Sequence, residues 1–241
     1  MKVYIQCDKH GFPASHNFFV AYEGFKELGA EIHFFYELNE VPSPTRNLIL
    51  VSFVEPTRVY LHKWGYSLPD IDYPTELSSY LERKIWLSTM DTIRMHPEQW
   101  PVFIKPLEDK VFTGVLVQSM RDLIRCGSVD DCIIRCSEPV EFITEWRCFV
   151  RYGRILDVRH YKGDWRACLD TDIVEQAVRE YSSAPSGYAI DFGLTKDGKT
   201  LLVEVNDGYA LGEYGLFYLD YAKLLSARWC ELTDGEDEYN F

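Results

Sequence analysis

Short apolar runs separated by polar segments dominate the first third of the chain. Three of these runs have the length of β-strands and span residues 3–7, 31–36 and 48–54. Between the first two, residues 14–28 carry apolar side chains at helical spacing. This order of strand, helix and strand predicts a small α/β lobe, and the proline-rich segment 68–74 predicts its boundary.

The middle of the chain mixes the two periodicities. Thr75 can cap a helix that runs through Leu77, Leu81 and Ile85, with Lys84 near its end. Strands are predicted at residues 102–106, 115–118 and 132–136, with a helix at 119–126. This region therefore reads as a small α+β lobe.

The last hundred residues are rich in strand patterns. Strands are predicted at residues 142–150, 155–160, 188–193 and 201–206, and helices at 171–181 and 215–229. Residues 234–239 are acidic, and we expect them to be solvated. The predicted division is an N-terminal lobe at 1–73, a small central lobe at 74–137 and a C-terminal lobe at 138–241.

The hairpin at residues 188–206 carries the most informative polar side chains. Asp191 lies between apolar neighbours, and Glu204 and Asn206, two residues apart on the returning strand, project from one face. Oxygen ligands inside apolar strands can be satisfied by a hard cation such as Mg²⁺. A hairpin with one polar face explains the same pattern, so both interpretations stay open here.

Composition narrows the class of protein. The 241 residues are 46% hydrophobic and 15% aromatic, which is ample for a buried core. The formal charge of −13 argues against a broad surface for nucleic acid or anionic membrane. No apolar run approaches the ~20 residues of a membrane span, and the seven cysteines lack zinc-site spacing. We therefore expect a cytoplasmic protein with reduced thiols.

Two groups of side chains suit phosphate and ribose. Lys105 ends an apolar strand, and Lys110 lies in the loop that leads to Gly114, so both can meet phosphate oxygens. Glu145 and Arg147 share one strand face, where a carboxylate can bind ribose hydroxyls and a guanidinium a transferring phosphoryl group. Surface lysines and a plain Glu/Arg salt bridge are the competing interpretations.

A second basic cluster contains Arg159, Lys162 and Arg166. In so acidic a chain, this cluster can bind an anionic substrate or the γ-phosphate of ATP. The alternative is that these residues only form an exposed, solvated strand face. Neither the phosphate-binding P-loop spacing nor a serine-hydrolase elbow is present in the sequence.

Taken in chain order, these features resemble the ATP-grasp superfamily over residues 75–219. The sharpest motifs are Phe-Ile-Lys-Pro at 103–106, Glu-Trp-Arg-Cys-Phe-Val at 145–150 and Leu-Val-Glu-Val-Asn-Asp-Gly at 202–208. The two lysines and Arg147 resemble the R2K clade, and residues 145–166 are also similar to ligases that append glutamate to ribosomal protein tails. Many relatives have a Pro-Gly turn after Glu-x-Asn, whereas this chain has Asp207 to Gly212 there.

The resemblance implies a mixed α/β and α+β fold in which two α+β lobes clasp ATP beside a small N-terminal α/β lobe. It implies that Lys105 and Lys110 contact the phosphates of ATP and that Arg147 faces the transferred phosphoryl group. It also implies that Glu145 binds the ribose and that residues 137–140 contact the adenine. The remaining expected nucleotide contacts are Lys84, Glu138 and Val140, and the weaker catalytic candidates are Arg159 and Arg166. The implied Mg²⁺ ligands are Asp191, Glu204 and Asn206.

The function implied is an ATP-dependent carboxylate–amine ligase that works through an acyl phosphate. The expected substrate is a small amino acid or a peptide, with anionic character suggested by the basic cluster. No nucleic-acid or membrane partner is expected, and a homodimer is left open. An inactive nucleotide-binding scaffold and a phosphotransferase that uses the same ATP site are the alternative functions.

Overall fold

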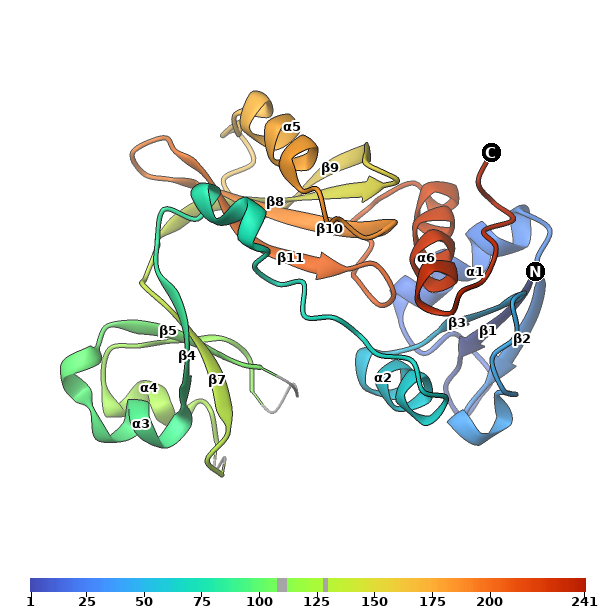
Figure 1. Cartoon of the computed structure of the whole chain (residues 1–241), viewed down its shortest axis with the longest axis horizontal. Coiled ribbons are helices and arrows are strands. Elements are labelled where there is room, and N and C mark those ends of the chain that lie inside the picture. The colour runs from blue at the N-terminus through green and yellow to red at the C-terminus, as the bar shows by residue number, and fades with distance from the viewer. Residues whose placement is uncertain (108–111, 128–129) are drawn as a thin grey trace. The chain divides into compact units, whose positions relative to one another are not determined.

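The computed structural model describes residues 1–107, 112–127 and 130–241, which form two compact units (Figure 1). The first unit combines Met1–Tyr80 with Ile143–Phe241, and the second is Leu81–Phe142. Each unit has its own hydrophobic core. The division into three lobes, with boundaries at residues 73 and 137, stays a prediction.

The N-terminal part of the first unit is a parallel sheet in the order β2-β1-β3. Its elements are β1 (Lys2–Gln6), α1 (His16–Glu27), β2 (Glu31–Phe35), β3 (Leu48–Val51) and α2 (Val54–Lys63). Helix α1 begins after Ser15, whose hydroxyl accepts a hydrogen bond from the Phe18 amide at 3.3 Å. The predicted α/β lobe is present, and helix α2 was not foreseen. Pro56 is tolerated there because it lies in the first turn of that helix.

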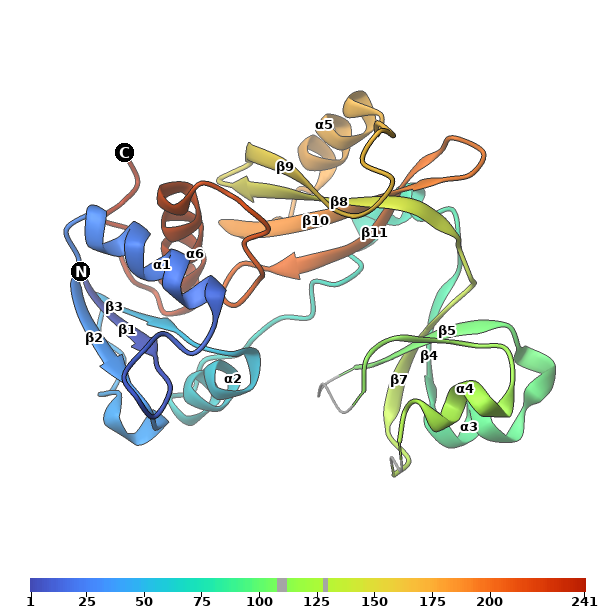
Figure 2. The same ribbon diagram turned by 180° about the vertical axis from the view of Figure 1, so that it is seen from behind.

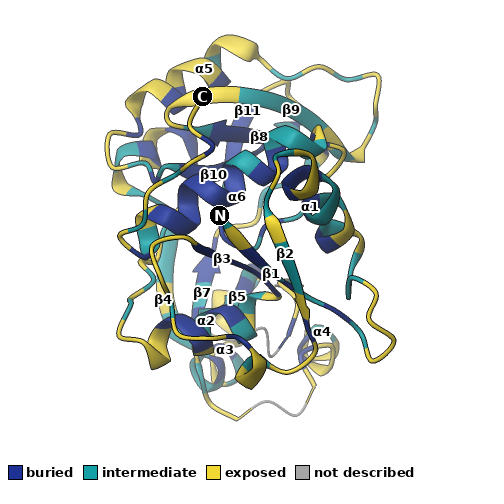
Figure 3. Cartoon of the chain, turned by 90° about the vertical axis from the view of Figure 1, so that its right-hand side faces the viewer, coloured by how far each residue is buried: buried dark blue, intermediate teal, exposed yellow. Residues whose placement is uncertain are grey.

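The rest of the first unit is an antiparallel sheet in the order β11-β10-β8-β9. The strands are β8 (Phe142–Arg151), β9 (Arg154–Gly163), β10 (Gly187–Thr195) and β11 (Thr200–Asp207), and the helices are α5 (Thr171–Glu180) and α6 (Tyr218–Leu232). Strand β10 is buried along nearly its whole length (Figure 3). The predicted strands and hairpin are confirmed, whereas the last helix begins three residues later than expected.

Helices α1 and α6 pack side by side and join the two sheets of this unit (Figures 1 and 2). The contact is so close that a Cβ atom at Gly24 would lie 2.3 Å from the Tyr218 carbonyl oxygen, so a larger residue cannot replace Gly24 without displacing α6. Residues from both sheets, among them Val3, Phe149 and Ala189, belong to one core cluster. The N-terminal lobe is therefore fixed to the second sheet by a shared core.

The second unit contains an antiparallel sheet in the order β4-β7-β5-β6. Its elements are β4 (Ile85–Thr89), α3 (Met90–Met95), β5 (Val102–Pro106), β6 (Val115–Val117), α4 (Met120–Ile124) and β7 (Ile133–Ser137). The helix expected from Thr75 through Ile85 is wrong. A short 3₁₀ helix, Thr75–Tyr80, ends before Glu82, whose φ of 44° breaks helical geometry, and Ile85 begins a strand paired with β7.

No helix in the described ranges is both long enough and apolar enough to cross a lipid bilayer. All seven cysteines are free, and five of them are buried.

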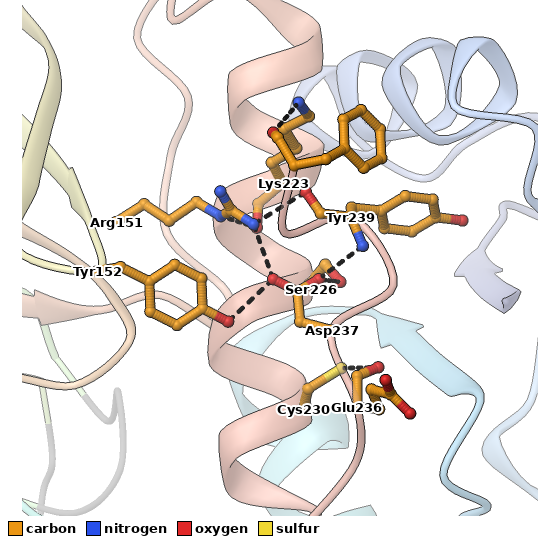
Figure 4. Close-up of polar contacts among 9 residues, drawn as sticks. Arg151, Tyr152, Lys223, Ser226, Cys230, Glu236, Asp237 and Tyr239 are labelled. Atoms are coloured by element: carbon orange, nitrogen blue, oxygen red, sulfur yellow. Dashed lines mark hydrogen bonds and ion pairs between the residues drawn. The ribbon is translucent and has the colours of Figure 1, made fainter.

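The acidic segment at residues 234–239 was expected to be solvated. This holds for the exposed Asp234, Glu236 and Glu238, but it is wrong for Asp237 and Tyr239. The Asp237 carboxylate accepts hydrogen bonds from Arg151 Nη2 at 2.8 Å, Ser226 Oγ at 2.6 Å and the Tyr152 hydroxyl at 3.0 Å (Figure 4). Tyr239 is only 4% exposed and packs against the Phe25 ring, 6.0 Å between centroids. The acidic composition of the segment gave no indication that Tyr239 is buried or that Asp237 pairs with Arg151.

We expect Asp237→Ala to lower the free energy of unfolding by about 2–4 kcal/mol, because it leaves the buried Arg151 guanidinium without its carboxylate. Chemical denaturation of the full chain measures the change. Glu236→Ala is the matched control because Glu236 is an exposed acidic residue of the same segment. Equal stability of the two variants would contradict an anchoring role for Asp237.

Candidate active site

Strand β8 presents Glu145 and Arg147 on one face of the four-stranded sheet. Both side chains are nearly buried, with residue exposures of 7% and 6%. Across the β8–β9 pair, Arg147 lies opposite Arg159 and Glu145 lies opposite Lys162. Since directly opposed residues of antiparallel strands project to the same face, the predicted ribose and phosphoryl residues share this face with part of the basic cluster.

Strands β10 and β11 bring the three predicted metal ligands together. Asp191 lies directly opposite Glu204, and Asn206, two residues further along β11, shares that face. The Asn206 amide nitrogen donates a hydrogen bond to Asp191 Oδ2 at 3.1 Å. The register shifts between Asp191 and Phe192, and such irregularities often re-aim side chains at functional sites. The role of these residues as metal ligands stays a prediction.

The central contact of the face is a buried ion pair between Arg147 and Asp191. Arg147 Nε donates to Asp191 Oδ1 at 2.8 Å and Nη2 donates to Oδ2 at 2.7 Å, a bidentate geometry. Burial raises the pKa of the Asp191 carboxyl, and the hydrogen bonds and charge of Arg147 oppose that rise. Burial lowers the pKa of Arg147, but pairing with Asp191 outweighs it and the net shift is upward.

Two tyrosines that the sequence did not single out complete this face. The rings of Tyr161 and Tyr214 stack at 4.9 Å between centroids, and Arg147 Cζ lies 4.7 Å from the Tyr214 centroid. The Tyr161 hydroxyl donates to Glu145 Oε2 at 2.7 Å, and Lys162 Nζ also pairs with Glu145. Burial, followed by the nearby carboxylates, raises the pKa of Tyr161.

The sequence indicated only indirectly that Tyr161 and Tyr214 lie at the candidate active site. Tyr161 lies inside the basic cluster that attracted attention for its charges, and Tyr214 lies just beyond the turn at residues 207–212 that departs from the pattern of relatives. Neither signal indicates an aromatic contact with Arg147, because that contact depends on how the turn folds back over the sheet.

The basic candidates Arg159 and Arg166 differ in position. Arg159 Nη2 pairs with Asp157 Oδ2 at 2.6 Å, on the strand beside Arg147. Arg166 follows β9 and is exposed, and its Nε pairs with Asp164 Oδ1 at 3.0 Å. Each arginine thus has a carboxylate two residues before it, which reduces its excess charge. Their catalytic roles stay predictions.

The remaining nucleotide candidates belong to the second unit. Lys84 and Glu138 contact each other twice: the Lys84 amide donates to Glu138 Oε2 at 2.9 Å, and the Glu138 amide donates to the Lys84 carbonyl at 3.1 Å. Lys105 is the residue before the last of strand β5 and lies opposite Arg135, and the half-buried Val140 follows β7. Lys110 lies outside the described residues. The nucleotide-binding roles of all five residues stay predictions.

The donor chemistry at Asp191, Glu204 and Asn206 fits a hard divalent cation. Two carboxylates and an amide supply oxygen ligands, and donation from Asn206 Nδ2 to Asp191 leaves the amide oxygen as the ligand atom. Within the described parts of the chain, no group of three or more histidine, cysteine, aspartate or glutamate side chains could hold a metal ion. The predicted Mg²⁺ site differs from such a group because its third ligand is the amide of Asn206.

Comparison with known families assigns the chain to a class. Residues 80–224 match the profile of an ATP-grasp domain, R2K clade family 2. The match covers well over half of the chain, so the protein belongs to this ATP-grasp family. The predicted membership of the R2K clade is thereby confirmed. A search of curated proteins found no match.

Solved structures show the same fold at low sequence identity. N5-carboxyaminoimidazole synthetase from Staphylococcus aureus aligns with a TM-score of 0.60 and 10% identity, covering 98% of this chain and 77% of that chain. D-cycloserine synthetase DcsG aligns with a TM-score of 0.59 and 13% identity, covering 93% of this chain and 98% of that chain. ATP-grasp ligase PsnB aligns with a TM-score of 0.53 and 14% identity, covering 95% of this chain and 98% of that chain. That structure is a complex with a phosphomimetic variant of a minimal precursor, Mg and ADP. The predicted ATP-grasp fold is confirmed.

We expect Arg147→Met to lower the free energy of unfolding by about 3–5 kcal/mol, because it leaves the Asp191 carboxylate buried without its partner. Adding Asp191→Asn should recover part of this loss, since the double variant no longer buries an unpaired charge. Urea denaturation of both single variants and of the double variant measures these effects. Losses that simply add in the double variant would show that the two side chains are not coupled.

Proposed function

We propose that the protein is an ATP-dependent carboxylate–amine ligase that forms an amide or peptide bond through an acyl phosphate. One observation carries the proposal: in a chain of the R2K ATP-grasp family, a single sheet face gathers the acid, arginine and oxygen-ligand residues that such a reaction needs. These residues are Glu145, Arg147, Asp191, Glu204 and Asn206.

The proposed cofactors are ATP and Mg²⁺, and the solved structure of PsnB, a neighbour of the same fold, is a complex with Mg and ADP. Asp191, Glu204 and Asn206 would hold the metal ion, which neutralises phosphate charge when bound. Glu145 would accept hydrogen bonds from ribose hydroxyls, and Arg147 would orient and stabilise the transferred phosphoryl group. The second unit would supply further nucleotide contacts through Lys84, Lys105, Lys110, Glu138 and Val140.

The proposed reaction has two steps. The γ-phosphoryl group of ATP passes to an oxygen of the substrate carboxylate, which gives ADP and an acyl phosphate. The substrate amine then attacks the carbonyl carbon, the C–N bond forms, phosphate leaves with the carboxylate oxygen and the nitrogen releases a proton. Positioning and charge neutralisation supply the catalysis, so the protein needs no nucleophile of its own.

We propose a peptide or amino acid as the substrate. The solved structure of the neighbour macrocyclase MdnC is bound with precursor peptide MdnA, which supports a peptide as one class of substrate. The basic cluster of Arg159, Lys162 and Arg166 is the basis for proposing an anionic substrate, which would replace the carboxylate that each of these side chains now contacts. We propose a cytoplasmic location, because reduced thiols are typical of that compartment. We also propose that the protein can form a homodimer.

One contact favours a second candidate function, a nucleotide-binding scaffold without turnover. Both carboxylate oxygens of Asp191 accept hydrogen bonds from Arg147, so the metal ion and the guanidinium share one carboxylate. A phosphotransferase reaction at the same site is a third outcome. The nature of the product distinguishes the three.

We expect ADP release when the full chain is incubated with Mg²⁺, ATP and pooled amino acids and peptides, analysed by mass spectrometry. A ligase joins two substrates with loss of water, whereas a phosphotransferase leaves phosphate on its product. A phosphorylated product, ADP formation without a joined product, or no ADP at all would contradict the ligase proposal. Chelation of Mg²⁺ with EDTA should abolish the activity.

Two substitutions test the site assignment. Lys105→Ala should weaken nucleotide binding by about tenfold, as expected for one lost charge-assisted phosphate contact. Glu204→Gln should leave the fold intact and lower kcat by about a hundredfold or more, because a metal ligand loses its charge. Calorimetric titration with ADP and steady-state kinetics measure these effects. Unchanged behaviour in both variants would contradict the assignment.

A further inference from the structure

The segment 212–215 connects the candidate active site to the N-terminal lobe. At one end, the Gly212 carbonyl accepts a hydrogen bond from Arg147 Nη1 at 3.4 Å. The Glu213 amide donates to Asn17 Oδ1 at 3.3 Å, and Glu213 Oε1 lies 3.3 Å from His16 Nε2. The same carboxylate accepts a hydrogen bond from the Gly215 amide at 2.5 Å. Glu213 thus fixes the segment to the first turn of α1.

Tyr214 has an unusual conformation within this segment. Its φ is 42°, in the left-handed region that is unfavourable for a bulky side chain by about 1–2 kcal/mol. Such backbone strain persists only where the surroundings hold it, and it is concentrated at functional sites. The residue is also 46% exposed, so burial of the ring does not account for its position. The ring contacts that accompany this conformation are those with Arg147 and Tyr161.

The Tyr214 ring covers the guanidinium of Arg147. The guanidinium is held at its edge by Asp191 and by the Gly212 carbonyl, and Tyr214 lies against it with 4.7 Å between Cζ and the ring centroid. Tyr161 supports the Tyr214 ring from its stacked position, with an interplanar angle of 17°. Because Arg147 is nearly buried, a cation–π contact here is stronger than the same contact in water.

We propose that Tyr214 is a positioning residue for Arg147: its ring restricts movement of the guanidinium and limits access of water to it. Hydrogen bonds at the edge leave a guanidinium able to swing on its flexible side chain, and a stacked ring opposes that movement. The effect on turnover rests on the proposed function, whereas the effect on Arg147 itself does not. An aromatic residue at 214 is therefore required, and its hydroxyl is not.

The chain contains a matched control for this contact. Tyr152 also has a positive φ, 48°, is 41% exposed and lies 4.8 Å from the guanidinium carbon of an arginine, Arg151. It lies at the β8–β9 turn, outside the candidate active site. Its hydroxyl also donates to Asp237, so Tyr152→Leu removes at least as many structural contacts as Tyr214→Leu.

The test compares the wild-type chain with Tyr214→Phe, Tyr214→Leu and Tyr152→Leu. The first measurement is the rate at which phenylglyoxal modifies Arg147 in the ligand-free protein, followed by peptide mass spectrometry. We expect Tyr214→Leu to raise this rate by several-fold, and Tyr214→Phe and Tyr152→Leu to match the wild type. The second measurement compares kcat with the Kd of ADP in the presence of Mg²⁺. Tyr214→Leu should lower kcat by about tenfold or more with an unchanged Kd, because a misplaced reacting group slows chemistry without weakening binding.

Each result has a distinct meaning. Equal modification rates for Tyr214→Leu and the wild type would overturn the positioning role, as would equal losses of kcat in Tyr214→Leu and Tyr152→Leu. A Tyr214→Phe variant as impaired as Tyr214→Leu would also overturn it, because the ring would not be the active feature. Failure of the wild-type chain to bind nucleotide would overturn the proposed function, and the modification rates would still decide the role of Tyr214.

Discussion

The buried ion pair between Arg147 and Asp191 is the interaction on which the candidate active site depends. Each charge would be unfavourable by several kcal/mol if it were buried alone, so each side chain requires the other. The pair joins β8 to β10 at the centre of the four-stranded sheet, and Asn206 extends it to β11. The predicted phosphoryl and metal residues are therefore one connected group and not two neighbouring sites.

This group is coupled to the N-terminal lobe by direct contacts within one compact unit. The segment 212–215 touches Arg147 at one end and α1 at the other, through Asn17 and His16. Helices α1 and α6 share a tight contact at Gly24, and the C-terminal segment fastens Tyr239 into the same core. A substrate bound beside the N-terminal lobe would thus meet a site whose geometry that lobe helps to define.

The sequence predicted the parts of this arrangement that depend on local spacing. Alternation along β8, β10 and β11 was sufficient to place Glu145 with Arg147 and Glu204 with Asn206, because strand geometry fixes which residues share a face. The pairing of Arg147 with Asp191 could not be predicted, since it depends on which strands become neighbours. The stacking of Tyr214 depends on a turn in a left-handed conformation, which no apolar pattern reveals. The buried Asp237 was hidden for a related reason, because its arginine partner is far away in sequence.

The reaction proposed for this sheet face is the transfer of a phosphoryl group to a carboxylate, followed by amide formation. An isotope experiment tests it most directly: a substrate found to stimulate ADP release is labelled with ¹⁸O in its carboxylate, and the released phosphate is analysed by mass spectrometry. We expect ¹⁸O to appear in the phosphate, because the carboxylate oxygen leaves with it. Unlabelled phosphate, with all ¹⁸O retained in the organic product, would rule out an acyl phosphate.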